Sequence, residues 1–159
     1  MTFRKLQWLF PIAVTLHNAE EAIWMPGWHA PLLEDVVGRP PGSAEIRAAL
    51  VVFTLAAFAV TYLSARRGPE SIWAYLTFGY IVAMLANVFV PHVPAAVVFR
   101  GYAPGVATAV LINFPVMSIL AIRMLRERWV SGWKAVVFGV GVPLVLGGAI
   151  VVWLAGRII

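Results

Sequence analysis

The chain has 159 residues, of which 62% are hydrophobic and 12% charged, and its formal net charge is +5. A soluble domain has about 25% charged residues, so this composition excludes an ordinary soluble fold and predicts a chain that lies in lipid. The absence of cysteine excludes a disulfide framework, a thiolate nucleophile and a cysteine-ligated metal. Basic residues form short clusters between apolar runs, which is typical of membrane helix ends and argues against nucleic acid as a partner.

Five apolar stretches are each close to the ~20 residues that cross a ~30 Å hydrocarbon core at 1.5 Å per residue. They predict an all-α, polytopic membrane helix bundle that forms one domain over residues 1–159. The predicted spans cover about 6–25, 46–65, 72–90, 104–125 and 135–155. Residues 93–99 are apolar but too few to cross, which indicates a re-entrant or interfacial segment. Glycines from Gly139 to Gly148 predict close packing of the last span.

The basic residues favour a cytoplasmic N-terminus in a bacterial-type plasma membrane. In that orientation the inner loops hold Arg4, Lys5, Arg66, Arg67, Arg123, Arg126, Arg128 and Lys134, whereas the outer side holds Arg39, Arg47, Arg100 and Arg157. Tryptophans fall at both predicted membrane boundaries, as interfacial aromatic residues do. The first span ends in His-Asn-Ala-Glu-Glu, which is a poor signal-peptide cleavage site, so we expect the span to be retained.

An outer loop of about 26–45 is rich in proline and glycine and predicts a rigid, non-helical cap. Its acidic residues, Glu34 and Asp35, are expected to be solvated. His29 follows a tryptophan at the predicted interface and is a weaker candidate for function than the histidines discussed below.

Three ionisable residues, His17, Glu20 and Glu21, lie inside the first predicted span. On a helix, Glu20 lies about −60° and Glu21 about +40° from His17, so one face presents all three. An ionisable group inside a membrane costs at least ~2.5–3.5 kcal/mol and is a functional candidate by default. The span has no lysine or arginine, so protonation, a bound cation or a base from another helix must balance the carboxylates. A purely structural polar network is the weaker explanation, because its cost is high.

Further polar residues are expected at the same outer level of the membrane. On the helical rise, Glu21 lies roughly 6 Å, Asn87 roughly 8 Å and His17 roughly 12 Å below the outer surface, with His92 near the surface. One outward-facing site follows if the first and third spans are neighbours.

The segment that leads into the fourth span adds Arg100 and Tyr102 at the same level. The tyrosine hydroxyl could donate to a developing oxyanion, and the arginine could hold an anionic head group. Asn113 lies at a depth similar to His17 and is a candidate for the cavity wall, and Pro115 predicts a loosened helix beside it. Pro104 suits the first turn of the fourth helix.

Together these motifs resemble the family of integral membrane proteins named for the HXXEE motif. The features that carry the resemblance are the HxxEE of the first span, the later histidine and a Y-x-P-G segment. The resemblance implies that His17, Glu20, Glu21, His92, Tyr102 and Gly105 are signature positions. It implies a membrane enzyme and supplies no reaction.

The first hypothesis is a metal-dependent membrane enzyme. His17, Glu21 and His92 would ligate a divalent cation, with zinc as the first choice, and Glu20 would take a proton from water. Asn87 and Tyr102 would assist catalysis, while Arg100 and Asn113 would bind substrate. The expected substrate is hydrophobic or lipid-like and enters from the bilayer, and the expected reaction is hydrolysis or hydration.

Two alternatives stay open at the level of sequence. Two adjacent carboxyl groups at low dielectric can act as a metal-free acid–base pair in isomerisation, cyclisation or epoxide opening. Intramembrane carboxylates and histidines also mark pathways in proton- or cation-coupled transporters. Against a transporter, the chain shows no internal repeat and the cluster lies away from the midplane. The sequence does not predict the oligomeric state.

Overall fold

A computed structural model describes residues 2–28 and 41–155 and shows an all-helical chain without strands in those two ranges. In chain order the elements are α1 (Phe3–Leu6), α2 (Leu9–Trp24), α4 (Ser43–Arg67), α5 (Ile72–Asn87), the π-helical turn η1 (Val88–His92), α6 (Val93–Val98), α7 (Val106–Thr108), the π-helical turn η2 (Ala109–Asn113), α8 (Phe114–Arg126) and α9 (Gly132–Ala155). The predictions on His29, Glu34 and Asp35 lie outside the described residues.

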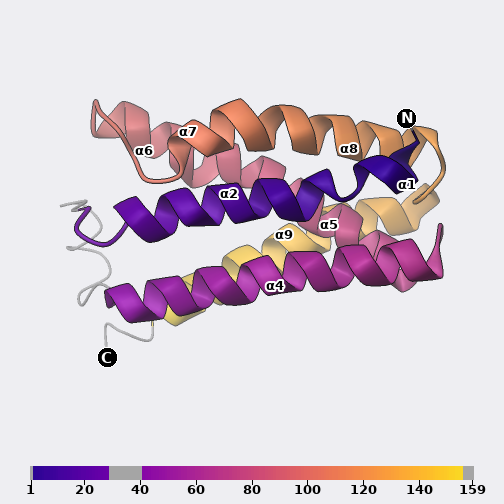
Figure 1. The fold of residues 1–159 in the computed structure, drawn as a ribbon, viewed down its shortest axis with the longest axis horizontal. Helices are drawn as coiled ribbons and strands as arrows, with labels where there is room; N and C mark the ends of the chain where they lie inside the picture. The colour runs from indigo at the N-terminus through magenta and orange to yellow at the C-terminus, as the bar shows by residue number, and fades with distance from the viewer. Residues whose placement is uncertain (1, 29–40, 156–159) are drawn as a thin grey trace.

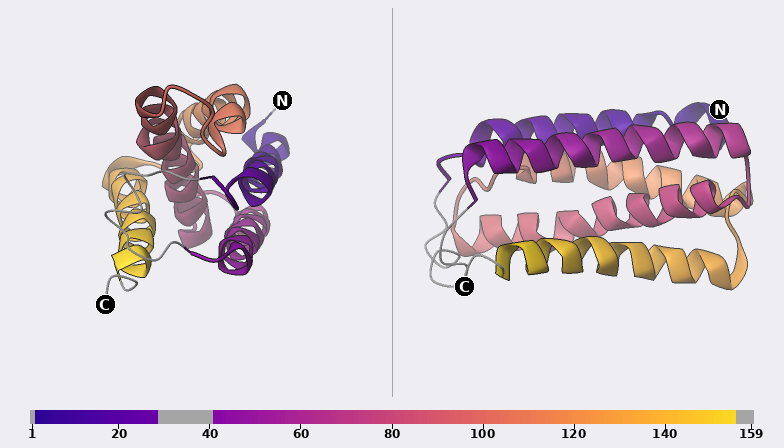
Figure 2. Two further views of the ribbon diagram at one scale, coloured as in Figure 1. Left: turned by 90° about the vertical axis from the view of Figure 1, so that its left-hand side faces the viewer. Right: turned by 90° about the horizontal axis from the view of Figure 1, so that it is seen from below.

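The helices run side by side as one elongated bundle (Figure 1). Helix α5 packs against α4, α8 and α9, and α2 packs against α4 on one side and against η2 and α8 on the other. The end-on view shows this arrangement around α5 (Figure 2). The fully buried side chains of α2, α5 and α8 form the core between them: Phe10, Ile81, Met117, Leu120 and Met124.

Four helices are long and apolar enough to cross a membrane, and the shorter N-terminal helix α2 lies alongside them. The four are Ser43–Arg67, Ile72–Val98, Val106–Arg126 and Gly132–Val152. Their outer faces carry exposed valine, leucine and isoleucine, and only 6% of the most apolar window of the last helix is buried within the protein. Such surfaces are stable against lipid and would not be against water. The predicted membrane helix bundle is therefore confirmed.

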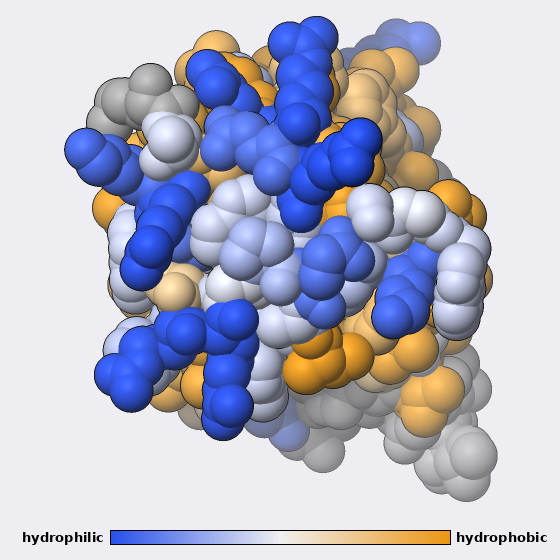
Figure 3. Space-filling view, turned by 90° about the vertical axis from the view of Figure 1, so that its right-hand side faces the viewer, coloured by the Kyte–Doolittle hydropathy of each residue, from blue (hydrophilic) through white to orange (hydrophobic). Residues whose placement is uncertain are grey.

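The two ends of the bundle differ in character. One end, which we call the basic end, gathers α1, the turn between α4 and α5, and the turn between α8 and α9 (Figure 1). Hydrophilic side chains cover much of this end (Figure 3). The other end, called the site end, holds the end of α2, the start of α4, α6 and α7. Placement of the basic end in the cytoplasm stays a prediction.

Prolines explain where the third and fourth spans depart from regular helix. Pro91 lies inside η1, where Val90 has the non-helical angles φ −149° and ψ 110°, and the chain then continues as α6. Pro115 offers no N–H to the carbonyl of Leu111, and the π-helical turn η2 occupies that position. Residues 93–99 are therefore mostly helical, and their interfacial placement stays a prediction.

Close contact between α5 and α9 depends on one glycine from each helix. A Cβ added to Gly79 would lie 2.5 Å from the carbonyl oxygen of Phe138, and one added to Gly139 would lie 3.1 Å from Phe78. The predicted packing role is thus correct for Gly139. At Gly141, Gly147 and Gly148 an added Cβ would meet no atom within 4 Å in the described part of the chain, so these glycines make no close helix contact there.

Candidate functional site

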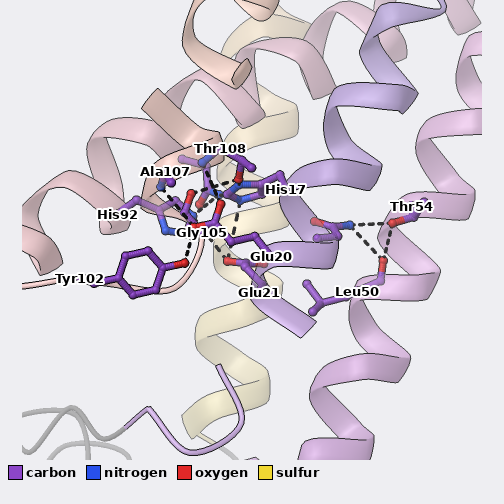
Figure 4. Close-up of polar contacts among 12 residues, drawn as sticks. His17, Glu20, Glu21, Leu50, Thr54, His92, Tyr102, Gly105, Ala107 and Thr108 are labelled. Atoms are coloured by element: carbon purple, nitrogen blue, oxygen red, sulfur yellow. Dashed lines mark hydrogen bonds and ion pairs between the residues drawn. The ribbon is translucent and has the colours of Figure 1, made fainter. Parts of the chain in front are cut away.

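The polar residues of the first, third and fourth spans converge at the site end of the bundle (Figure 4). Helix α2 contributes His17, Glu20 and Glu21, and the junction of α5 with η1 contributes Asn87 and His92. The segment before and within α7 contributes Tyr102, Gly105 and Thr108.

His17, Glu21 and His92 form a compact, buried cluster. Oε1 of Glu21 lies 3.8 Å from Nε2 of His17 and 3.5 Å from Nε2 of His92. One ligand atom from each of the three residues lies within 4.8 Å of the others, and the residues are 1%, 8% and 4% exposed, respectively. The prediction that these three residues face one point is confirmed, and the cluster could hold a metal ion.

Asn87 defines how the two imidazole rings are presented. Its amide nitrogen lies 3.3 Å from Nε2 of His17 and 2.9 Å from Nε2 of His92. Because an amide nitrogen only donates hydrogen bonds, both Nε2 atoms act as acceptors and both rings are neutral. The lone pairs of both Nε2 atoms therefore point toward the amide of Asn87, and the same two atoms lie within 4 Å of Oε1 of Glu21.

The other nitrogen of each ring has its own partner. Nδ1 of His17 lies 2.9 Å from the hydroxyl oxygen of Thr108, to which it donates when Nε2 is an acceptor. The ring of His92 lies near the backbone carbonyl of Pro104. For His17 this partner selects the tautomer with the proton on Nδ1, in which the lone pair of Nε2 faces Asn87.

Glu20 faces a different set of partners from Glu21. Its Oε1 accepts hydrogen bonds from the hydroxyl of Tyr102 and, at 3.2 Å, from the N–H of Ala107. Its Oε2 accepts a hydrogen bond of 2.8 Å from the N–H of Thr108. These N–H groups belong to the first turn of α7, where no carbonyl of the helix is available to them. Glu20 therefore caps the fourth span and positions the threonine that contacts His17.

Tyr102 lies at the outer edge of the site. Burial and the hydrogen bond to Glu20 raise the pKa of Tyr102 to about 12. The phenol is therefore a neutral hydrogen-bond donor at physiological pH.

Gly105 permits the closest contacts in the site. A Cβ at this position would lie 2.6 Å from Cε1 of His92, 3.0 Å from Cε1 of His17 and 3.1 Å from Cγ of Glu21. Its φ is +84°, a left-handed conformation that favours glycine. Its backbone thus covers the cluster directly. The fourth span consequently begins at Val106, two residues after the predicted start at Pro104.

Asn18 sets the rotation of α2 about its axis. Its amide nitrogen donates hydrogen bonds to the carbonyl of Leu50, at 3.0 Å, and to the hydroxyl of Thr54, at 2.8 Å. Both partners belong to α4, on the far side of α2 from α7 (Figure 4). This anchor turns His17 and Glu21 toward η1 and α7.

Two predicted substrate-binding residues lie apart from the cluster contacts. Arg100 is exposed and forms no side-chain hydrogen bond or ion pair with the described residues. Asn113 is 0% exposed, and neither polar atom of its side chain has a hydrogen-bond partner within the described part of the chain. Five residues separate it from Thr108, which places it about 7.5 Å deeper along the helix. The substrate-binding roles of both residues stay predictions.

Sequence reasoning missed Thr108 and the covering role of Gly105. A threonine in an apolar helix is common, because its hydroxyl can bond to the helix backbone, so Thr108 gave no signal. Gly105 was part of the Y-x-P-G resemblance, but its contacts depend on the path of the preceding loop.

Comparisons with known proteins identify the family of the chain. Residues 8–120 match the family described as "Protein of unknown function with HXXEE motif". The chain is also 36% identical over 133 residues to the uncharacterized protein YrkK of Bacillus subtilis (strain 168), covering 80% of this chain and 79% of that protein. No solved structure gives a significant match. The matched region contains all the residues that build the cluster, and the chain belongs to the HXXEE-motif family.

Proposed function

We propose that this protein is a membrane metalloenzyme that hydrolyses or hydrates a hydrophobic, lipid-like substrate. The observation that supports this most is the convergence of His17, Glu21 and His92, whose ligand atoms lie within 4.8 Å of one another in a buried position. Cation binding accounts for two imidazoles and a carboxyl group directed at one point inside a membrane protein, where unpaired ionisable groups are costly.

The donor set fits a divalent cation of the zinc type. Two histidines and one glutamate are the ligand set of a class of catalytic zinc sites, which keep a further position for water. A zinc ion held there would act as a Lewis acid and lower the pKa of a bound water. The hydrogen bond between Thr108 and Nδ1 of His17 is of the kind that orients histidine ligands.

Glu20 and Tyr102 are suited to proton handling beside the cluster. The carboxylate shares its Oε1 with the phenol hydroxyl, and that phenol also lines an open cleft at the site end. A proton accepted by Glu20 is therefore next to a group that faces the cleft. In this proposal Glu20 is the proton acceptor and Tyr102 donates a hydrogen bond to the reacting substrate.

The cleft favours an apolar substrate. It has a volume of about 400 Å³ and is lined by Ile23, Trp24, Pro26, Gly27, Trp28 and Tyr102. None of these side chains is charged, and three are aromatic rings. An uncharged lipid-like molecule can bury its apolar part there and place a polar functional group at the Tyr102 hydroxyl.

Metal-free acid–base catalysis is the second candidate, and Asn87 is the observation that favours it. Its amide already occupies both Nε2 atoms, so neither imidazole needs a cation to complete its hydrogen bonding. A cation bound by both rings would displace this amide from at least one of them. Isomerisation or epoxide opening by the carboxyl groups needs no such rearrangement.

Metal content separates the two candidates. We expect the purified protein to hold one metal ion per chain by elemental analysis, and His17→Ala and His92→Ala each to lower this to well below half. His29→Ala removes the third histidine of the sequence and is the matched control, for which stoichiometric metal is expected. Full metal content in both cluster variants would reject the ligand assignment.

Chelation then tests the reaction. The metal-loaded protein in nanodiscs is assayed against neutral long-chain esters and epoxides before and after removal of the metal. We expect turnover that is lost on chelation, restored by zinc, and strongly reduced in Glu20→Gln. Turnover that survives complete metal removal would instead support the acid–base candidate.

A further inference from the structure

A second cleft lies at the basic end, opposite the His/Glu cluster. It has a volume of about 500 Å³, and its lining includes Arg4, Arg66, Arg67, Glu127 and Trp129. The three arginines come from two separate elements, α1 and the end of α4, so the fold brings them together. Figure 3 shows this end of the molecule, where hydrophilic side chains predominate.

The one acidic group in the lining is already neutralised by other groups. Oε1 of Glu127 lies 3.2 Å from Nη1 of Arg123, with which it forms an ion pair. Its Oε2 accepts a hydrogen bond of 2.8 Å from the N–H of Phe3. The carboxylate is thus used in holding α1 against the turn that follows α8, and it does not pair with the three arginines of the cleft.

The arginines are left with unused donors. The side chains of Arg4 and Arg67 form no hydrogen bond or ion pair with residues 2–28 or 41–155. Arg66 donates through Nη1 to the hydroxyl of Tyr62, and its guanidinium group lies 5.7 Å from the centre of that ring. One guanidinium is therefore held in place, and two are available to an external anion.

The surroundings indicate which anion this is. Just beyond the cleft along α2 and α4, Trp8 is 40%, Leu9 43% and Tyr62 49% exposed. Tryptophan and tyrosine in such positions mark the boundary between head groups and acyl chains. Guanidinium groups bind phosphate oxygens through paired hydrogen bonds, and basic pockets at this level of membrane proteins bind lipid head groups.

We propose that the cleft formed by Arg4, Arg66 and Arg67 binds the phosphate of an anionic phospholipid. The phosphodiester lies between the arginines, and the acyl chains extend along the exposed apolar surface of α2 and α4. The site is independent of the His/Glu cluster and of the reaction proposed for it. It assigns the arginines a specific ligand in addition to their effect on topology.

Lipid titration of delipidated protein in a neutral detergent tests this assignment. Binding is followed by the shift in Tm and by tryptophan emission, since Trp129 lines the cleft. The probes are short-chain phosphatidylglycerol, short-chain phosphatidylcholine and inorganic phosphate. We expect phosphatidylglycerol to bind at least tenfold more tightly than phosphatidylcholine, and inorganic phosphate to bind weakly.

Two double variants locate the binding site. Arg4→Gln with Arg67→Gln should weaken binding of phosphatidylglycerol tenfold or more. The matched control, Arg126→Gln with Arg128→Gln, removes the same charge from the same end but outside the cleft, and should change binding less than twofold. Arg4→Lys with Arg67→Lys keeps the charge without the planar guanidinium donors, and should fold and bind with intermediate affinity.

Several outcomes would overturn the proposal. Equal weakening by the cleft pair and the control pair would show that only the overall charge of the basic end matters. Equal binding of the two phospholipids would remove the anionic requirement. Inorganic phosphate binding as tightly as phosphatidylglycerol would identify a free phosphate as the ligand and reject the lipid. If the glutamine pair fails to fold, the lysine pair and the comparison of lipids still decide.

Discussion

Replacing Gly105 with alanine is the most direct test of the site geometry. The added Cβ would lie 2.6 Å from Cε1 of His92, whereas carbon atoms in good contact are about 3.5–4.0 Å apart. The ring or the loop must therefore move by about 1 Å. Metal sites tolerate deviations of about 0.2 Å in their ligand distances, so we expect Gly105→Ala to lose its metal.

The same substitution should also lower the free energy of unfolding. A residue with a Cβ in the left-handed conformation costs about 1–2 kcal/mol, and an overpacked core costs about 1–3 kcal/mol. Their sum predicts a loss of about 2–5 kcal/mol, measured by denaturant unfolding in detergent alongside metal content. Gly132→Ala is the matched control, because Gly132 has φ +57° and a Cβ there meets nothing within 4 Å. It should show only the conformational cost and keep its metal.

The two variants together can refute the reasoning. If Gly105→Ala binds metal at the wild-type stoichiometry and is no less stable than Gly132→Ala, then the backbone does not cover the cluster as described. If both variants lose metal, a general loss of stability rather than the contact with the rings is responsible.

Three further predictions concern the partners of the cluster. Thr108→Val removes the hydroxyl that bonds to Nδ1 of His17 and should weaken metal affinity about 10–100-fold without changing the fold. Thr108→Ser should restore the affinity. Unchanged affinity in Thr108→Val would contradict an orienting role. Asn18→Leu removes two hydrogen bonds to α4, and each such bond within a membrane contributes about 0.6 kcal/mol. The variant should therefore lower the free energy of unfolding by about 1 kcal/mol. No loss of stability would indicate that packing alone orients α2. Because the folded state raises the pKa of Tyr102 to about 12, folded protein should bind more protons than unfolded protein between about pH 10 and 12. Stability should therefore fall as pH rises through that window, and less so in Tyr102→Phe; tyrosinate absorbance that shows Tyr102 ionised at pH 10 would contradict this.

The sequence predicted the helices well because a helix that crosses the hydrocarbon core needs a long, predominantly apolar segment. A run of about 20 apolar residues bounded by arginines has few alternatives to a membrane helix. The predicted second and last spans, 46–65 and 135–155, correspond to Ser43–Arg67 and Gly132–Ala155. The bends were harder to place, since Pro91 and Pro115 indicate a disturbed helix without specifying a π-helical turn.

The cluster was predicted to the extent that helical periodicity could place it. His17 and Glu21 are four residues apart and necessarily neighbours on a helix. Glu20 lies about 100° from Glu21 on the same helix, and sequence alone could not show that this angle separates their partners. In the structure Glu21 faces the histidines, and Glu20 accepts hydrogen bonds from the start of α7. That division depends on where the loop of residues 99–105 returns.

The adjacency of the first and third spans was an assumption that no local pattern could support. In the structure α4 packs against both helices, and the two spans meet through side chains, Phe10 with Tyr80 and His17 with Asn87. Thr108 entered the site for the same reason. Its hydroxyl, like that of many helical threonines, can form a hydrogen bond with the backbone of its own helix. A histidine becomes its partner only because α2 packs beside it.

The three sequence features of the family act as one connected unit in the structure. Tyr102 donates to Glu20, and Glu20 accepts from the N–H of Thr108, whose hydroxyl bonds to His17. The backbone of the Y-x-P-G segment then contacts both histidine rings at Gly105. A tyrosine, a carboxylate and a glycine from two separate parts of the sequence are therefore connected to the two imidazoles. A polar network kept only for packing between helices would not require a left-handed glycine against the rings. The proposed function accounts for this glycine, because donor atoms that bind one cation must stay in register and Gly105 leaves room for both rings.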